Sequence, residues 1–181
     1  MNLRRAIIVL LLSGLVGLGG MSACAAQHST IPTVPTVDLQ RFAGDWYVLA
    51  NIPTFIETNA YNAMEHYAPP EGKRIETRFT FNEGALDGPL KTYNPTAFVS
   101  TPSNSVWGMQ FIWPFRAEYR IVYVDPDYQH TIVGRTKRDF VWIMARSAHI
   151  DETTYQSLLQ KVAELGYDLT KIRRIPHTAK S

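Results

Sequence analysis

The chain has 181 residues, with 18 basic and 16 acidic side chains and a formal net charge of +2. This length allows one domain with a sizeable hydrophobic core and an N-terminal extension. Both excess positive charges, Arg4 and Arg5, lie in the first 23 residues, which are predicted to be a signal peptide. The remaining residues therefore carry no formal net charge. A neutral domain lacks the basic surface that binds nucleic acid, and this class of function is excluded.

The first 23 residues are predicted to be a lipoprotein signal peptide. After two arginines comes an apolar run at 6–18, which is shorter than the roughly 20 residues that a membrane-spanning helix needs. Residues 21–24, Met-Ser-Ala-Cys, resemble a bacterial lipobox, and Cys24 is the only cysteine in the chain. Because it has no disulfide partner, Cys24 is expected to carry a lipid. Ordinary cleavage after Ala25, which would remove the cysteine, is the alternative.

The residue after Cys24 is alanine, not the aspartate that signals inner-membrane retention in enterobacterial lipoproteins. That resemblance implies a protein anchored in the bacterial outer membrane by its lipid, with its domain facing the periplasm. Residues 24–37 are polar and rich in proline and threonine, so we expect an extended tether. The folded domain is predicted at 38–176, followed by a tail at 177–181.

Eight short β-prone runs follow Asp38, separated by turns rich in proline, glycine and aspartate. The predicted strands cover residues 46–52, 61–67, 74–82, 91–99, 105–113, 118–125, 130–136 and 139–147. Strands at this spacing form a sandwich or an up-and-down barrel, so the sequence predicts a mainly β, antiparallel fold.

A helix is predicted after the eighth strand. Asp151 is placed to cap its N-terminus, and Gly166 is placed to end it. The apolar stripe of this helix consists of Tyr155, Leu158, Leu159, Val162 and Leu165. A stripe of this kind packs against the rest of the domain. A ninth, short strand is expected at 171–175.

Two motifs at the ends of the strand region narrow the choice of fold. Gly44 and Trp46 stand at the start of the first strand, and Arg146 ends the eighth. An arginine lying over a tryptophan ring forms a cation–π pair, worth about 1–2 kcal/mol when partly desolvated. The two motifs bracket all eight strands, and together they resemble the first and third motifs of the lipocalin family. The turn at residues 124–128 keeps the aspartate of the middle motif but shifts its tyrosine.

The resemblance implies an eight-stranded antiparallel up-and-down β-barrel, the lipocalin calyx, with one C-terminal α-helix and a short ninth strand. The sequence is most similar to the bacterial branch of outer-membrane lipoprotein lipocalins. In this family the paired arginine and tryptophan close the base of the barrel. Trp46 is therefore expected to be structural, as are Gly44 and Arg146. Eight-stranded barrels, lipocalins among them, are wide enough to hold one small ligand.

Strand alternation predicts which side chains face the barrel interior, because every second residue points the same way. The predicted ligand-binding residues on these faces are Phe79, Phe81, Trp107, Met109, Phe111, Tyr119, Ile121, Tyr123 and Trp142. Aromatic rings and a flexible methionine suit a pocket for long apolar chains. The alternative is that these rings fill a packed barrel with no cavity.

Glu65 is predicted to point inward as well, by analogy with the family. A carboxyl there would have a raised pKa if dry, and would meet a polar head group or a water. A bulge that turns it to solvent is the alternative. The five histidines have no metal-ligand spacing, and no nucleophile or cofactor motif is present. We therefore predict no enzyme activity, no cofactor and no metal.

The leading hypothesis is a lipid-anchored envelope lipocalin that binds a fatty acid, a lysophospholipid or a similar amphiphile. Its expected role is lipid storage or transport and membrane maintenance. The expected partners are those amphiphiles and the outer membrane, with the protein a monomer or weak homodimer. Two alternatives remain: a lipid isomerase or hydrolase with Glu65 as its base, and a structural lipoprotein with a filled barrel.

Overall fold

The computed structural model describes residues 29–178, so the predicted signal peptide and Cys24 lie outside the described residues. The β-strands are β1 (Gly44–Ile52), β2 (Ala60–Tyr67), β3 (Arg74–Glu83), β4 (Leu90–Tyr93), β5 (Thr96–Val99), β6 (Val106–Ile112), β7 (Phe115–Val124), β8 (His130–Gly134), β9 (Val141–Ala145) and β10 (Arg173–Arg174). The α-helices are α1 (Leu39–Phe42) and α2 (Glu152–Glu164), with a 3-10 helix at Leu169–Lys171.

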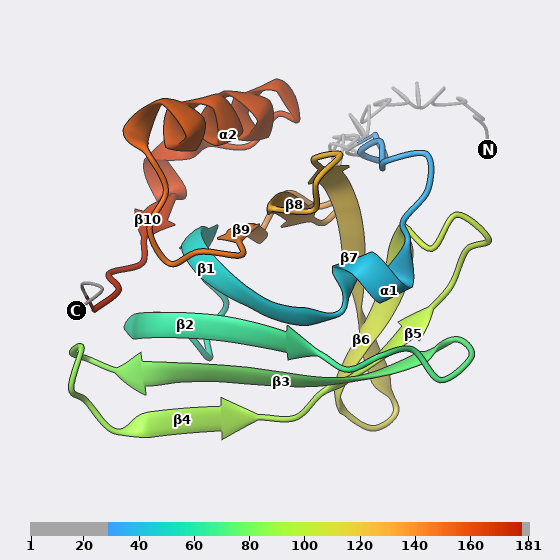
Figure 1. Cartoon of the computed structure of the whole chain (residues 1–181), viewed down its shortest axis with the longest axis horizontal. Coiled ribbons are helices and arrows are strands. Elements are labelled where there is room, and N and C mark those ends of the chain that lie inside the picture. The colour runs from blue at the N-terminus through green and yellow to red at the C-terminus, as the bar shows by residue number, and fades with distance from the viewer. Residues whose placement is uncertain (1–28, 179–181) are drawn as a thin grey trace, which may run out of the picture.

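The strands form one antiparallel sheet that closes on itself (Figure 1). Neighbouring strands pair in the order β1, β2, β3, β5, β6, β7, β8 and β9, and β9 then pairs back with β1. Counting β4 and β5 as one interrupted strand, this is the predicted eight-stranded antiparallel barrel, and the prediction is confirmed. A closed barrel leaves no unpaired edge strand.

The fourth predicted strand, residues 91–99, is interrupted where Asn94 and Pro95 separate β4 from β5. Both pieces pair with β3. Proline has no backbone N–H and cannot donate to the ladder, so the strand breaks there. The carbonyl of Pro95 is still used, because it accepts from the backbone N–H of Thr77 at 3.1 Å and from its hydroxyl at 2.8 Å.

Two hydrophobic clusters stabilise the molecule. One fills the barrel interior, and the other lies between α2 and the outer faces of β1, β8 and β9 (Figure 1). The predicted helix is confirmed: Asp151 accepts from the backbone N–H of Thr154 at 2.9 Å, and Gly166 follows the last turn with φ +84°. The residues named in both clusters and in the closed ring of strands all lie within 29–178, so this segment contains the folded barrel.

The segment at 29–37, the described part of the predicted tether, has no helix or strand but is packed against the barrel. Ile31 and Val37 are fully buried. The N–H of Val34 donates to the carbonyl of Ile121 at 3.1 Å. These contacts make the segment part of the folded body rather than a free linker. Among residues 29–178, no helix has both the length and the apolar character to cross a bilayer.

Candidate ligand-binding site

The base of the barrel is closed by Trp46 and Arg146. Trp46 is fully buried, and its indole N–H donates to the carbonyl of Phe42 at 2.8 Å. The guanidinium carbon of Arg146 lies 3.8 Å from the Trp46 ring centroid. The Arg146 side chain also donates to the backbone carbonyls of Arg41, Phe42, Ala43 and Asp45. These bonds tie the start of the barrel to its end, so the two motifs close the base.

Gly44 is required at this closure by its backbone and by its neighbour. It has φ +97°, a conformation that residues with a side chain rarely adopt. A Cβ at this position would lie 3.3 Å from Nη1 of Arg146. The glycine therefore lets the arginine approach the first strand closely.

An aromatic cluster lies directly above the base. Trp107 is buried among Phe42, Tyr67 and Tyr119, and its ring stacks on Tyr119 with centroids 5.2 Å apart. Its indole N–H donates to the carbonyl of Asn104 at 2.7 Å. The hydroxyls of Tyr67 and Tyr119 are hydrogen-bonded to each other. Trp107 is therefore part of the packed floor of the barrel.

A cavity of about 280 Å³ lies above this floor and opens at the other end of the barrel. Its lining residues are Thr54, Phe55, Ile56, Glu57, Glu65, Tyr67, Phe79, Met109, Phe111, Ile112, Ala117, Glu118, Tyr119, Arg135, Phe140, Trp142 and Met144. The opening lies between the β1–β2 loop, the β6–β7 hairpin and the β8–β9 loop. The side chains of the barrel therefore do not fill its interior completely.

Six of the ten residues predicted to bind ligand line this cavity: Glu65, Phe79, Met109, Phe111, Tyr119 and Trp142. Three others, Phe81, Trp107 and Ile121, are buried in the packed interior and do not line it. Their prediction as lining residues is wrong in this respect. Strand alternation gives the face on which a side chain lies but not its depth along the barrel.

Tyr123 lies outside the barrel, and its prediction as an interior residue is wrong. The pairing of β7 with β8 shifts between Ile121, opposite Val133, and Tyr123, opposite Ile132. Such a bulge inserts one extra residue and reverses the alternation beyond it. Tyr123 consequently packs beneath α2, where the ammonium of Lys161 lies 4.7 Å from its ring centroid.

Glu65 lies inside the barrel without a partner. Its Oε2 is buried and has no hydrogen-bond partner among the described residues. Desolvation, and secondarily the nearby charge of Glu57, raise the pKa of Glu65 to about 8. A bulge does occur in β2, between Tyr61 and Met64, but Glu65 still faces the cavity. Its carboxyl is therefore largely protonated at neutral pH.

Three charged residues of the cavity lining, Glu57, Glu118 and Arg135, were not predicted, and Glu57 and Arg135 lie in loops at the opening. Glu57, on the β1–β2 loop, is buried; its carboxylate accepts from the indole N–H of Trp142 at 3.1 Å, and burial raises its pKa. Arg135, after β8, lies 3.3 Å from Asp139, but its Nε is buried without a partner. Glu57 and Arg135 lie in loops that follow strands, where charged residues are usually exposed to solvent. No local sequence pattern therefore indicates that they line a cavity.

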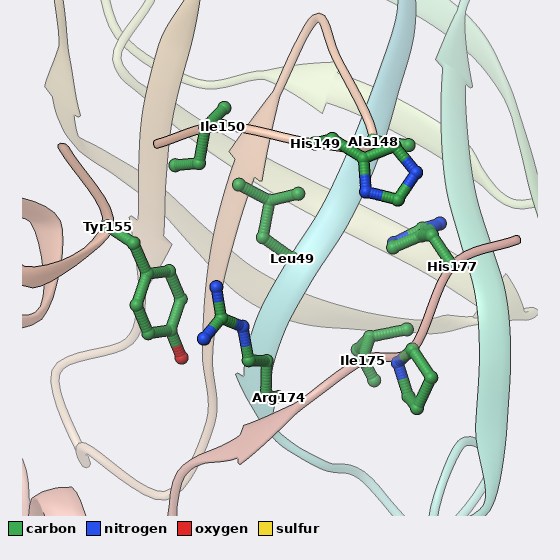
Figure 2. A pocket seen from close by; sticks show the side chains of 9 residues that line it. Leu49, Ala148, His149, Ile150, Tyr155, Arg174, Ile175 and His177 are labelled. Carbon is green, nitrogen blue, oxygen red and sulfur yellow. The ribbon is translucent and has the colours of Figure 1, made fainter. Parts of the chain in front are cut away.

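A second hollow, of about 310 Å³, lies outside the barrel between β1, β10 and the segment that joins β9 to α2 (Figure 2). Its polar walls already have partners within the protein. Arg174 lies 4.2 Å from the Tyr155 ring and pairs with Glu152 at 3.0 Å. His177 donates through Nε2 to the carbonyl of Val48 at 2.9 Å, and burial lowers its pKa. The cavity inside the barrel, with its unpaired polar atoms, is the better candidate site.

Within residues 29–178, no group of three His, Cys, Asp or Glu side chains is placed to hold a metal ion. A family model described as a lipocalin-like domain matches residues 37–177. The chain belongs to the lipocalin family. Lipocalins are small-molecule-binding barrels, and the cavity inside the barrel is the candidate ligand-binding site of this chain.

Similar proteins come from several kingdoms. Temperature-induced lipocalin-1 of Arabidopsis thaliana is 29% identical over 153 residues, which cover 78% of this chain and 80% of the relative. Outer membrane lipoprotein Blc of Escherichia coli K12 is 25% identical over 162 residues, covering 81% and 85%. Among solved structures, insecticyanin of the tobacco hornworm Manduca sexta has a TM-score of 0.65 at 15% identity, covering 83% and 85%. That structural similarity supports the fold alone.

Proposed function

We propose that the protein is a lipid-anchored envelope lipocalin that holds a fatty acid, a lysophospholipid or a similar amphiphile in its barrel. Its role would be lipid storage or transport and membrane maintenance. The observation that carries this proposal is an apolar cavity, open at one end, with an unpaired arginine atom at its opening. The name of one relative, an outer membrane lipoprotein, and the lone Cys24 support a lipid anchor in the outer membrane.

The cavity walls suit an acyl chain. Phe79, Met109, Trp142 and Met144 provide apolar surface from three different strands. Methionine side chains adapt their shape to a flexible chain, and rings give large contact areas. Burial of each methylene in such a wall contributes about 0.8 kcal/mol. A single chain therefore gains enough free energy to be held without a covalent bond.

The polar group of the amphiphile would lie at Arg135. This side chain lines the opening, and its Nε has no protein partner. Guanidinium groups bind carboxylates and phosphates through charge-assisted hydrogen bonds. An anionic head group, a fatty-acid carboxylate or a lysophospholipid phosphate, matches this position.

Titration of the delipidated protein with palmitate and with a lysophospholipid, followed by native mass spectrometry, tests the proposal. We expect one bound amphiphile per barrel. Arg135→Gln should weaken binding about tenfold, the loss of one charge-assisted contact. Arg78→Gln, on the exposed outer face of β3, is the matched control and should bind as the wild type. Absence of binding to either amphiphile would overturn the proposal.

A second candidate, a lipid isomerase or hydrolase, draws on Glu65. A carboxyl with a pKa of about 8 in an apolar cavity exchanges its proton near neutral pH, and its ionised form would act as the general base. Turnover of a bound lipid that is abolished by Glu65→Gln would support it. Recovery of chemically intact amphiphile after long incubation would oppose it.

Lipid anchoring has its own measurement. The intact mass of protein extracted from the membrane distinguishes an acylated N-terminal Cys24 from an N-terminus created by cleavage after Ala25. We expect the acylated mass, and Cys24→Ser should release the protein from the membrane fraction.

A further inference from the structure

The opening of the cavity carries the most exposed hydrophobic side chains in the described part of the chain. Phe55, on the β1–β2 loop, is 87% exposed, and Ile112, Trp113 and Phe115, on the β6–β7 hairpin, are 72%, 82% and 76% exposed. Phe111 beside them is 43% exposed. We call these five residues the apolar rim. Isolated surface hydrophobics are ordinary, but a group of them on two adjacent loops marks an interaction surface.

The apolar rim is continuous with the interior of the barrel. Phe55, Phe111 and Ile112 are exposed at the surface and also line the cavity. The opposite end of the barrel is different, because the loops there carry residues such as Glu71, Lys73 and polar turn residues. Among residues 29–178, no large hydrophobic side chain is exposed at that closed end. The exposed apolar surface therefore belongs to the end through which a ligand enters.

The composition of the hairpin identifies the partner. Residues 111–116 read Phe-Ile-Trp-Pro-Phe-Arg and contain no acidic residue. Tryptophan and phenylalanine on a protruding turn, followed by a cation, are typical of segments that lie in the head-group region of a bilayer. Arg116, which follows the hairpin turn, is exposed, and its guanidinium lies 3.6 Å from the Phe98 ring centroid. A protein partner usually covers about 800 Å² and about 20–30 residues of a surface, whereas the apolar rim consists of five residues on two loops.

We propose that the apolar rim inserts into the interface of a phospholipid bilayer. The amphiphile would then pass between bilayer and cavity along continuous apolar surface, without crossing water. The identity of this cargo rests on the proposed function, whereas insertion of the rim is a separate property of the surface. The rim would thus make loading and release occur at the membrane.

Co-sedimentation with vesicles tests insertion. The protein comprising residues 29–181, which lacks Cys24, is mixed with phosphatidylcholine vesicles that contain or lack phosphatidylglycerol. We expect binding to both, and most of it should persist in high salt because apolar insertion is not screened. The double variant Trp113→Ser and Phe115→Ser should bind at least tenfold more weakly. Leu169→Ser, on an exposed residue of the 3-10 helix that is not part of the rim, is the matched control and should bind as the wild type.

Tryptophan fluorescence gives a second readout. Trp113 is exposed, Trp46 and Trp107 are buried, and Trp142 lines the cavity, so the part of the quenching by brominated lipids that depends on Trp113 reports on the hairpin. We expect this quenching in the wild type and its loss in Trp113→Phe, with vesicle binding retained. Absence of vesicle binding would overturn the proposal. So would self-association that the double variant abolishes, because the rim would then be covered by a second copy of the chain.

Amphiphile binding in solution separates this proposal from the previous one. The double variant should hold palmitate as tightly as the wild type, because its changed side chains do not line the cavity. If the wild type binds palmitate but no vesicles, insertion is wrong and the proposed function stands. If it binds vesicles but no amphiphile, the proposed function is wrong and insertion stands.

Discussion

Single residues determine the electrostatics of the cavity. Glu65 and Glu57 are both carboxyls that line the cavity, and burial raises the pKa of each. Glu57 has the indole N–H of Trp142 and the backbone N–H of Thr54 as donors, whereas Oε2 of Glu65 has none. Of the two, Glu65 is therefore the group whose ionisation the fold resists more strongly.

Glu65→Gln is expected to change how stability depends on pH. Below the ordinary carboxyl pKa of 4.5, both the folded and the unfolded chain hold the Glu65 proton. Between 4.5 and about 8, only the unfolded chain releases it, so the wild-type free energy of unfolding falls as pH rises. The fall is at most about 1.4 kcal/mol per pH unit. Glutamine does not ionise, so the variant should lose this slope.

Urea unfolding of the wild type and Glu65→Gln at a series of pH values from 4 to 9 measures the effect. The two proteins should be similar in acid, and the variant should be more stable at the alkaline end. Glu76→Gln, on the exposed outer face of β3, serves as the control and should follow the wild type. Parallel curves for Glu65→Gln and the wild type would show that Glu65 is solvated.

At the scale of elements, capping and alternation patterns in the sequence predicted helix α2 and the regular strands correctly. The bounds of α2 follow from the Asp151 cap and from Gly166, which were predicted from their residue types. These patterns failed at interruptions: Pro95 divides a strand, and the bulge in β7 turns Tyr123 outward. A bulge depends on the pairing partner, so alternation within one strand does not reveal it.

Gly166→Ala is expected to lower the free energy of unfolding by about 1 kcal/mol, because φ is +84° there. A Cβ would also lie 3.2 Å from Nε of Arg138. Gly166→Asn should lose less, since asparagine tolerates this conformation better. Amphiphile affinity should be unchanged in both, because α2 lies outside the barrel. Chemical denaturation checks stability, and an alanine variant as stable as the wild type would contradict the argument.

At the scale of the molecule, the two family motifs, Gly44 with Trp46 and Arg146, together close the base of the barrel. Arg146 follows the last barrel strand, and its guanidinium contacts both the Trp46 ring and the carbonyls of α1. The ends of a barrel that is made from some hundred residues are thereby joined at the base. The cavity opens at the other end, so stability and binding depend largely on different residues.

Trp46→Ala is therefore expected to lower stability by about 3–5 kcal/mol, the usual effect of removing a large buried ring. Its effect on amphiphile affinity should be small, because Trp46 does not line the cavity. Trp107→Ala should behave in the same way, since Trp107 belongs to the floor. Phe79→Ala, which changes the cavity wall, should weaken binding as well. Thermal unfolding and palmitate titration of all three variants measure this; weakened binding by Trp46→Ala at an unchanged melting temperature would contradict it.

The sequence alone determined the β-class, the strand count, the helix and the paired motifs, because alternation, turn residues and caps act over a few neighbouring residues. Only the tertiary structure decided which interior rings border a cavity, since depth along the barrel depends on how the strands are staggered. It also decided that Glu57, Arg135 and the apolar rim meet at one opening. Those residues lie on loops far apart in the chain, and closure of the barrel alone brings them together.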